Sequence, residues 1–202
     1  MPQLRNKSEM AQAQRRLRSY RRLLSPLDIK RKQLIQEKNN ARRLLDATQE
    51  KMASIRQAVE RKVPMLANRE IDLTGLSRVK HVEFGTENRL GVTLPTIRHI
   101  HMESAPYGFM TKPHWVDTVK KLLDEYLQLC IYKQVNEQRV ALLEKAVLKA
   151  TQRVNITEKL LIPKTQKYIR AIQIHLDEIE RSSVVRAKIT KRLKAVKPEF
   201  PQ

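Results

Sequence analysis

The 202-residue chain has little cysteine, glycine or aromatic side chain, and it has no long apolar run. Its one cysteine, Cys130, excludes an intramolecular disulfide and a thiolate metal site, as is typical of proteins from a reducing compartment. Four glycines and 4% aromatic residues are too few for a β-sandwich, a β-barrel or a doubly wound sheet. The basic, polar N-terminal segment predicts neither a signal peptide nor a membrane span. These absences predict a protein of long helices in the cytosol or at the cytosolic face of a membrane.

Positive charge is in large excess. Lysine and arginine number 41 against 21 acidic residues, a formal net charge of +20, which predicts an anionic partner or surface. The N-terminal basic cluster comprises Arg15, Arg16, Arg18, Arg21 and Arg22. The C-terminal basic cluster comprises Arg181, Arg186, Lys188, Lys191, Arg192, Lys194 and Lys197. If the chain folds back on itself, both clusters come to the same end and form a positive surface for an acidic or mixed partner; a merely solvated face is the alternative.

The helix-breaking residues divide the chain into three segments. All four glycines lie within residues 63–113, together with several prolines, so this segment is expected to be turn-rich with a β-hairpin. Residues 1–62 are expected to form an N-terminal coiled-coil helix, and residues 114–202 a C-terminal coiled-coil helix with a basic tail. Each helical segment has one internal proline, Pro26 or Pro163, which should kink or locally open the helix.

Both helical segments contain a heptad repeat of apolar residues, which indicates a coiled coil. In the first, the a positions are Met10, Leu17, Leu24, Arg31, Lys38, Leu45, Met52 and Val59, and the d positions are Ala13, Tyr20, Leu27, Leu34, Ala41, Thr48, Ile55 and Lys62. In the second, the a positions are Val119, Tyr126, Lys133, Val140, Val147, Val154 and Leu161, and the d positions are Trp115, Leu122, Leu129, Asn136, Leu143, Ala150 and Thr157. After Pro163 the apolar series moves on by one residue, to Ile169, Ile172, Leu176 and Ile179. We therefore expect an all-α rod, a long antiparallel two-helix coiled coil with a short β-hairpin at its far end; self-dimerisation is the competing arrangement.

Two short stretches alternate apolar and polar residues and predict the strands of that hairpin. They are residues 77–84 and 90–94, with the turn at residues 85–89 and with Pro95 ending the second strand.

The sequence predicts no catalytic, cofactor or metal site. No glycine-rich phosphate loop is present, and no nucleophile is placed with a base. His99 and His101, with His81 and His114 nearby, come nearest to a metal cluster but lack a clear third ligand. A basic nucleic-acid binder and a coiled-coil tether are the alternative functions, although stacking aromatics and recognition motifs are missing.

Four motifs in sequence order resemble the D subunit of V/A-type rotary ATPases. They are residues 27–34 (LDIKRKQL), 87–95 (ENRLGVTLP), 151–163 (TQRVNITEKLLIP) and 176–181 (LDEIER). The residues of this chain that match the family's pattern or that we expect to shape its helix are Arg153, Asn155, Glu158, Pro163, Gly91 and Pro95.

The resemblance implies a central rotor shaft without cofactors. Such a shaft stands inside a ring of catalytic A and non-catalytic B subunits, binds the F subunit, and rests on a funnel-shaped subunit above the membrane rotor ring. It couples ATP hydrolysis or synthesis to proton or sodium transport, peripherally at the cytoplasmic side of the membrane, with no membrane insertion and no nucleic acid. Contacts with the catalytic ring are then expected at the N-terminal basic cluster and at Arg186, Lys188, Lys191 and Arg192.

Overall fold

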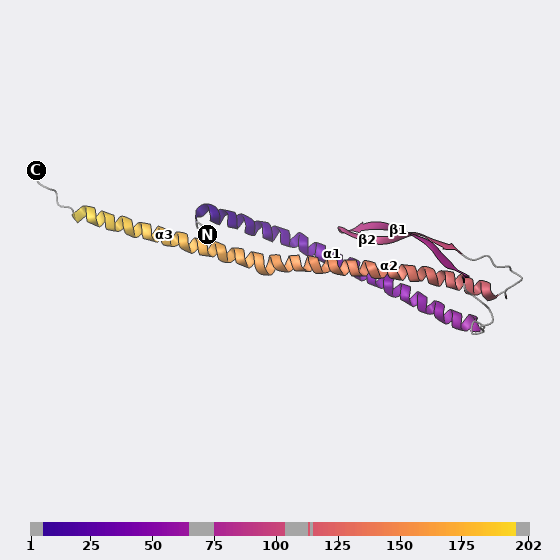
Figure 1. The fold of residues 1–202 in the computed structure, drawn as a ribbon. Helices are drawn as coiled ribbons and strands as arrows, with labels where there is room; N and C mark the ends of the chain where they lie inside the picture. The colour runs from indigo at the N-terminus through magenta and orange to yellow at the C-terminus, as the bar shows by residue number, and fades with distance from the viewer. Residues whose placement is uncertain (1–5, 65–74, 104–112, 114, 197–202) are drawn as a thin grey trace, which may run out of the picture. The chain divides into compact units, whose positions relative to one another are not determined.

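The computed structural model describes residues 6–64, 75–103, 113 and 115–196 of the chain. Three long helical stretches and one two-stranded sheet make up the fold (Figure 1). They form two compact units: unit 1 contains residues 1–29 and 151–202, and unit 2 contains residues 30–150. The predicted fold class, all-α with two long helices and a short antiparallel hairpin, is confirmed. The division into segments 1–62, 63–113 and 114–202 stays a prediction about domain organisation.

Helix α1 is a single α-helix over Lys7–Lys62. Asn6 caps its start, because the Asn6 side-chain oxygen accepts a hydrogen bond of 2.8 Å from the backbone N–H of Glu9. Pro26 lies inside the helix without interrupting it, so of the predicted kink or local opening the opening does not occur. Proline removes one backbone donor, and the seam positions Leu24 and Leu27 on either side are half-buried.

The second helical stretch contains a π-helical turn. Helix α2 spans Trp115–Asn155, the π-helix η2 spans Ile156–Leu161, and helix α3 spans Ile162–Val196. The backbone N–H of Ile162 donates to the carbonyl oxygen of Thr157, a bond across five residues. Pro163 follows directly and has no N–H to offer the preceding turn, so the predicted local opening at this proline is confirmed. A π turn holds one extra residue, which explains why the apolar series moves on by one.

The predicted seam positions are covered in both helices. Every a and d position of α1 is buried or half-buried except Lys62, and so is every one assigned from Trp115 to Leu161. Within unit 2, Asn136 lies 3.5 Å from Thr48 and Arg56 donates to the hydroxyl of Tyr126. These pairs run in opposite directions along α1 and α2, so the two helices are antiparallel there.

The hairpin differs from its prediction in length and in the position of its turn. Strands β1 (Arg78–Arg89) and β2 (Val92–Glu103) pair in antiparallel fashion, and Leu90 and Gly91 alone form the turn. Pro95 does not end β2; it lies within it, opposite Thr86. Each strand of a two-stranded sheet has one unpaired edge, where a proline nitrogen can face outward without costing a ladder hydrogen bond. The expected turn at residues 85–89 is wrong because residues 85–89 extend β1.

A core in unit 2 joins the hairpin to both helices. Leu94 of β2 and Leu143 of α2 are each 1% exposed, and they cluster with Leu34 of α1, which is 2% exposed. Around them pack Leu90 and Val92 of the hairpin together with apolar residues of α2. The hairpin therefore lies along the helix pair, as Figure 1 shows for the strands beside α2.

Candidate functional site

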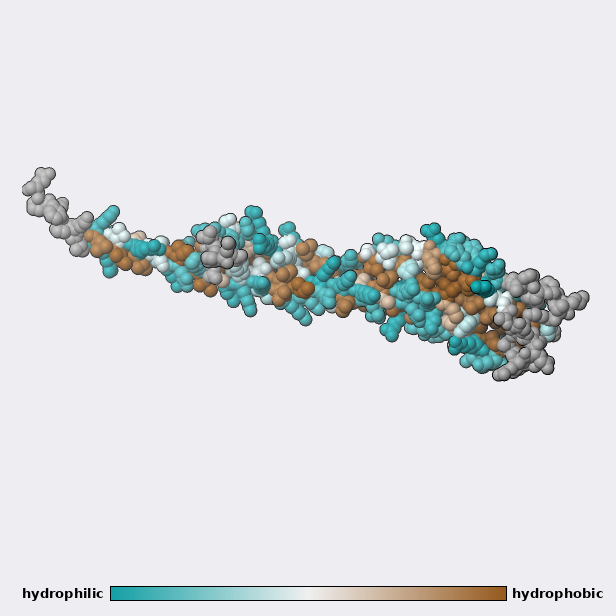
Figure 2. All heavy atoms as spheres, viewed as in Figure 1, coloured by the Kyte–Doolittle hydropathy of each residue, from teal (hydrophilic) through white to brown (hydrophobic). Residues whose placement is uncertain are grey.

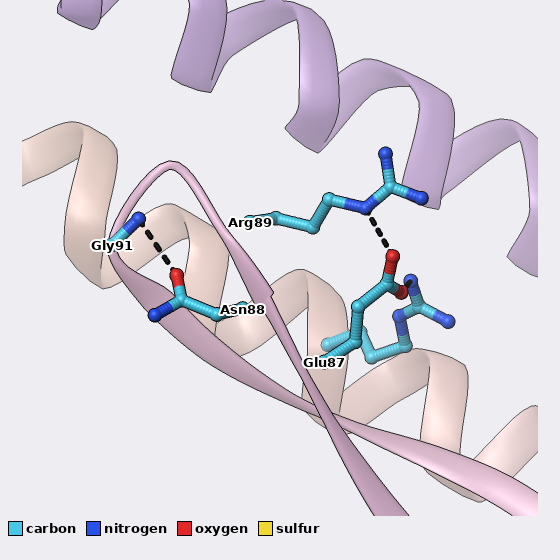
Figure 3. A network of polar contacts seen from close by, with 5 residues as sticks. Glu87, Asn88, Arg89 and Gly91 are labelled. Carbon is cyan, nitrogen blue, oxygen red and sulfur yellow. Dashed lines mark hydrogen bonds and ion pairs between the residues drawn. The ribbon is translucent and has the colours of Figure 1, made fainter.

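The tip of the hairpin carries the motif at residues 87–95, and its polar residues fix the turn. Leu90 and Gly91 both have positive φ, 55° and 81°, as a two-residue type I′ turn requires. The Asn88 side-chain oxygen accepts a hydrogen bond of 2.9 Å from the Gly91 N–H (Figure 3). Glycine suits this position because it adopts the left-handed conformation without steric cost. Gly91 is thus a turn residue in this fold.

Glu87 connects the hairpin to α2. One carboxylate oxygen accepts a hydrogen bond from Arg89, two residues further along the same strand (Figure 3), and the other oxygen lies 3.6 Å from the guanidinium of Arg139 in α2. Arg139 is not among the residues predicted from the sequence. An arginine next to the seam position Val140 was the available signal, but nothing in the sequence identified its partner.

The motif at residues 151–163 coincides with the π-helix and its flanks. Thr157 is buried and donates its hydroxyl to the carbonyl oxygen of Arg153 at 2.8 Å. Asn155 has α-helical backbone angles and makes no side-chain capping bond. The side chains of Arg153 and Glu158 are exposed, and Pro163 is half-buried. The motif's structural role therefore lies in the backbone at Thr157 and Pro163, while Arg153 and Glu158 face outward.

Both basic clusters belong to unit 1, but they do not lie side by side. The N-terminal cluster is on α1, where Arg16 lines the same cavity as Lys164 of α3. Further along α3, Glu180 forms an ion pair of 3.7 Å with Lys7, close to the start of α1. The described residues of the C-terminal cluster therefore follow that point along α3. All arginines of the N-terminal cluster, and Arg186, Lys188, Lys191 and Arg192, are exposed.

The last part of α3 carries an exposed apolar stripe among these cations. Val185, Ile189 and Leu193 recur every fourth residue and are 54%, 51% and 65% exposed. In Figure 2 brown apolar atoms are visible between teal polar ones on this end of the helix. This spacing of four residues differs from the heptad spacing of the seam, so the stripe forms a separate apolar surface on α3. A helix that presents apolar and basic residues together is suited to a partner with an apolar, acidic surface.

An open apolar groove of about 440 Å³ lies in unit 2 between the end of α1 and the start of α2. Ile55 and Val59 of α1 face Val119 and Leu122 of α2 across it. At its edge Arg56 donates to the Tyr126 hydroxyl at 2.6 Å, and this hydrogen bond raises the pKa of Arg56.

The described residues contain no group of three or more His, Cys, Asp or Glu side chains arranged to hold a metal ion. The structure nevertheless brings His81 and His101 to opposing positions on the two strands, with ring centres 6.4 Å apart, and His101 contacts Glu83 at 3.3 Å. His99 also lies on this hairpin, while His114 falls outside the described residues. None of the described helices combines the length and hydropathy that a membrane-spanning segment requires.

The fold and these surfaces define the class of protein: it consists of paired helices with a hairpin packed on them, and its basic and apolar surfaces are exposed. The sequence profile of the family described as the D subunit of ATP synthase matches residues 9–192. The chain belongs to this family of ATP synthase D subunits.

Individual relatives agree with this family. The chain is similar to the V-type ATP synthase D subunit of Borreliella burgdorferi, with 25% identity over 92% of this chain and 91% of the relative. It is 30% identical to the V-type ATP synthase D subunit of Chlamydia felis over 57% of this chain, and 32% identical to that of Chlamydia muridarum over 54%. The match spans about half the length of the chlamydial relatives, 55% and 54%. Membership of this family implies a complex with other subunits.

Proposed function

We propose that the chain is the central rotor shaft of a V/A-type rotary ATPase or ATP synthase. In this role it is a non-catalytic subunit that couples ATP hydrolysis or synthesis in a ring of A and B subunits to proton or sodium transport. The family assignment supports this proposal, and one structural observation carries it: the exposed apolar and basic end of α3.

This end of α3 extends well past the last ion pair that ties α3 to α1 among the described residues. From Glu180, which contacts Lys7, the helix continues to Val196, a distance of about 24 Å at 1.5 Å per residue. Exposed apolar residues gain free energy when a partner removes them from water, about 25 cal/mol per Å². The catalytic ring is the partner we assign to them, because a ring encloses a helix end on all sides.

The paired helices suit the transmission of torque. Two helices that share a buried seam resist bending and twisting better than a flexible linker of the same length. The exposed arginines around one part of the shaft give its surface an asymmetric charge. As the shaft turns, each catalytic interface then meets a different surface, and this difference biases its affinity for nucleotide.

The further partners are the F subunit and the funnel-shaped subunit that connects to the membrane rotor ring. We place the chain peripherally at the cytoplasmic side of the membrane, because the membership of the family implies a membrane-associated complex. The positive charge then serves protein contacts, with no role for nucleic acid.

The decisive experiment replaces the apolar stripe with polar residues. The variant Val185→Ser, Ile189→Ser and Leu193→Ser should fold normally, because these side chains are exposed in the isolated chain. In a reconstituted complex it should reduce ATP-driven ion transport at least severalfold. The matched control changes a different face of the same helix, with Ser183→Gln and Ala187→Gln, and should leave transport unchanged.

Transport at the wild-type rate in the stripe variant would contradict the contact between α3 and the ring. Equal losses in the stripe variant and the control variant would mean that helix stability, and not the apolar stripe, is the cause. Circular dichroism of each isolated variant separates the two explanations.

The N-terminal basic cluster is tested separately. Replacement of Arg15, Arg16, Arg18, Arg21 and Arg22 by alanine should allow assembly, because all five side chains are exposed and alanine favours helix. Coupling between hydrolysis and ion transport should fall. Wild-type coupling would remove this cluster from the proposed contact surface.

A further inference from the structure

A cavity in unit 1 shares one residue, Arg16, with the contact surface proposed above, but the proposed function gives the cavity itself no role. Its volume is about 510 Å³, and it lies between α1 and the beginning of α3, directly after the π-helix. Its lining residues are Ala13, Arg16, Tyr20, Leu161, Lys164, Thr165 and Tyr168. Of the N-terminal basic cluster, Arg16 is the member that lines the cavity.

The charges on the two sides of the cavity have the same sign. Arg16 comes from α1 and Lys164 from α3, and among the described residues neither is paired with a carboxylate. Positions that flank a coiled-coil seam usually hold opposite charges on the two helices. Two cations that face one cavity repel each other, and a bound anion would neutralise both.

The acid nearest in sequence to this side of α1, Glu9, is engaged through one of its two oxygens. The Tyr168 hydroxyl donates a hydrogen bond to that oxygen, and the other oxygen is buried with no hydrogen-bond partner among the described residues, so no cation holds this carboxylate. The Thr165 hydroxyl donates to the Leu161 carbonyl at 2.7 Å. Arg16 and Lys164 therefore remain as the donors that an incoming anion can use.

The other walls of the cavity are aromatic and apolar. Tyr20 and Tyr168 present rings, and Ala13 and Leu161 present aliphatic carbon. Such walls can pack against a flat, weakly polar ring, while the two cations can bind a negatively charged group. The volume is within the range of small-molecule sites, about 300–1,000 Å³, and π turns recur at functional sites.

We propose that this cavity binds a phosphate-bearing small molecule. The guanidinium of Arg16 has the planar geometry that pairs with two phosphate oxygens, and Lys164 adds a point charge from the opposite helix. Inorganic phosphate and a nucleotide such as ADP share this chemistry, and a nucleotide would also place its base against the tyrosine rings. The proposal does not depend on the rotor function.

The test measures binding of ADP, inorganic phosphate and adenosine to the full chain by isothermal titration calorimetry. A salt concentration of about 0.15 M suppresses diffuse attraction to the basic surface. The variants Arg16→Gln and Lys164→Gln should each weaken phosphate or ADP binding at least tenfold. The matched controls are Arg18→Gln and Lys167→Gln, exposed cations of the same two helices that do not line the cavity, and they should stay within twofold of the wild-type chain.

Each outcome decides the proposal. Binding of either phosphate source that depends on Arg16 and Lys164 supports it, and the ratio of the ADP and phosphate affinities identifies which source the cavity prefers. Equal weakening in all four variants would show diffuse electrostatic attraction and overturn it. Absence of phosphate and ADP binding at millimolar concentration, or adenosine binding as tight as that of ADP, would overturn it as well.

Discussion

The two units use the same antiparallel helix pairing but differ in how completely they bury their apolar residues. Unit 2 has a hairpin packed on its helices and a cluster of nearly inaccessible side chains, Leu34, Leu94 and Leu143. Unit 1 has a few buried residues, among them Ile172 at 0% exposure, and then an apolar stripe with more than half of each side chain exposed.

This difference separates a part with a shared core from a part that leaves more of its apolar residues exposed. In unit 2 the hairpin packs on part of the helix pair and buries Leu94 between them. In unit 1 the described apolar residues of the last turns of α3 are exposed, so we expect low local stability there. Substitutions in unit 2 should therefore act on folding, and exposed substitutions in unit 1 should act on assembly.

The largest effect is expected in the core of unit 2. Leu94→Ala removes a fully buried side chain that joins the hairpin to both helices, and should lower the free energy of unfolding by about 2–5 kcal/mol. Leu23→Ala in unit 1, where the side chain is 52% exposed, should change it by less than about 0.5 kcal/mol. Urea denaturation measures both. Similar losses in the two variants would contradict the comparison between the units.

A smaller effect is expected at the hairpin turn. Gly91→Ala places a side chain at φ 81°, a conformation that costs about 1 kcal/mol or more for a residue with a Cβ atom. Gly91→Asn should recover part of the loss, because asparagine tolerates left-handed angles. Hydrogen exchange of the strand amides should accelerate in the alanine variant. If alanine and asparagine behave alike, the positive φ is not what selects glycine here.

Sequence periodicity predicts the helices well because the seam is a local, repeating pattern. The heptads predict covered a and d positions from Met10 to Thr157, but they miss the buried Val116 and Val135. The predicted hairpin turn lies too early, because the alternation in residues 77–84 breaks at Gly85. In the structure Gly85 lies inside β1, where a Cβ would come within 2.9 Å of the Arg98 and Thr96 side chains. That close approach between strands depends on the register, which a single sequence does not reveal.

The candidate surfaces are predicted only in part, for a related reason. Charge clusters are visible in the sequence, and every described member is indeed exposed. Which residues face each other depends on the relative positions of paired helices. The sequence alone therefore could not predict that Arg16 and Lys164 line one cavity, or that Glu87 and Arg139 form an ion pair.

The π turn of unit 1 allows a test of what keeps the apolar seam in register there. Because a π turn holds one residue more than an α turn, deleting Lys159 together with Pro163→Ala should convert it to α-helix and keep Val154 and Ile172 on the same seam. We expect a loss below about 1 kcal/mol. Deleting Lys167 in regular helix should cost more, since it turns Ile172 by about 100° away from α1. Thermal denaturation compares the two, and equal losses would mean that the extra residue does not set the seam.

The smallest effect is expected for the ion pair that ties the hairpin to α2. Glu87 and Arg139 are both partly exposed, at 37% and 22% of their side chains, so solvent screens their attraction. A double-mutant cycle with Glu87→Gln and Arg139→Gln should give a coupling energy below about 1 kcal/mol, and high salt should reduce it. A coupling as large as the loss from Leu94→Ala would mean that charge, and not the apolar core, holds the hairpin on unit 2. A small coupling places the stability of unit 2 in its buried leucines and leaves the charged residues free to select partners.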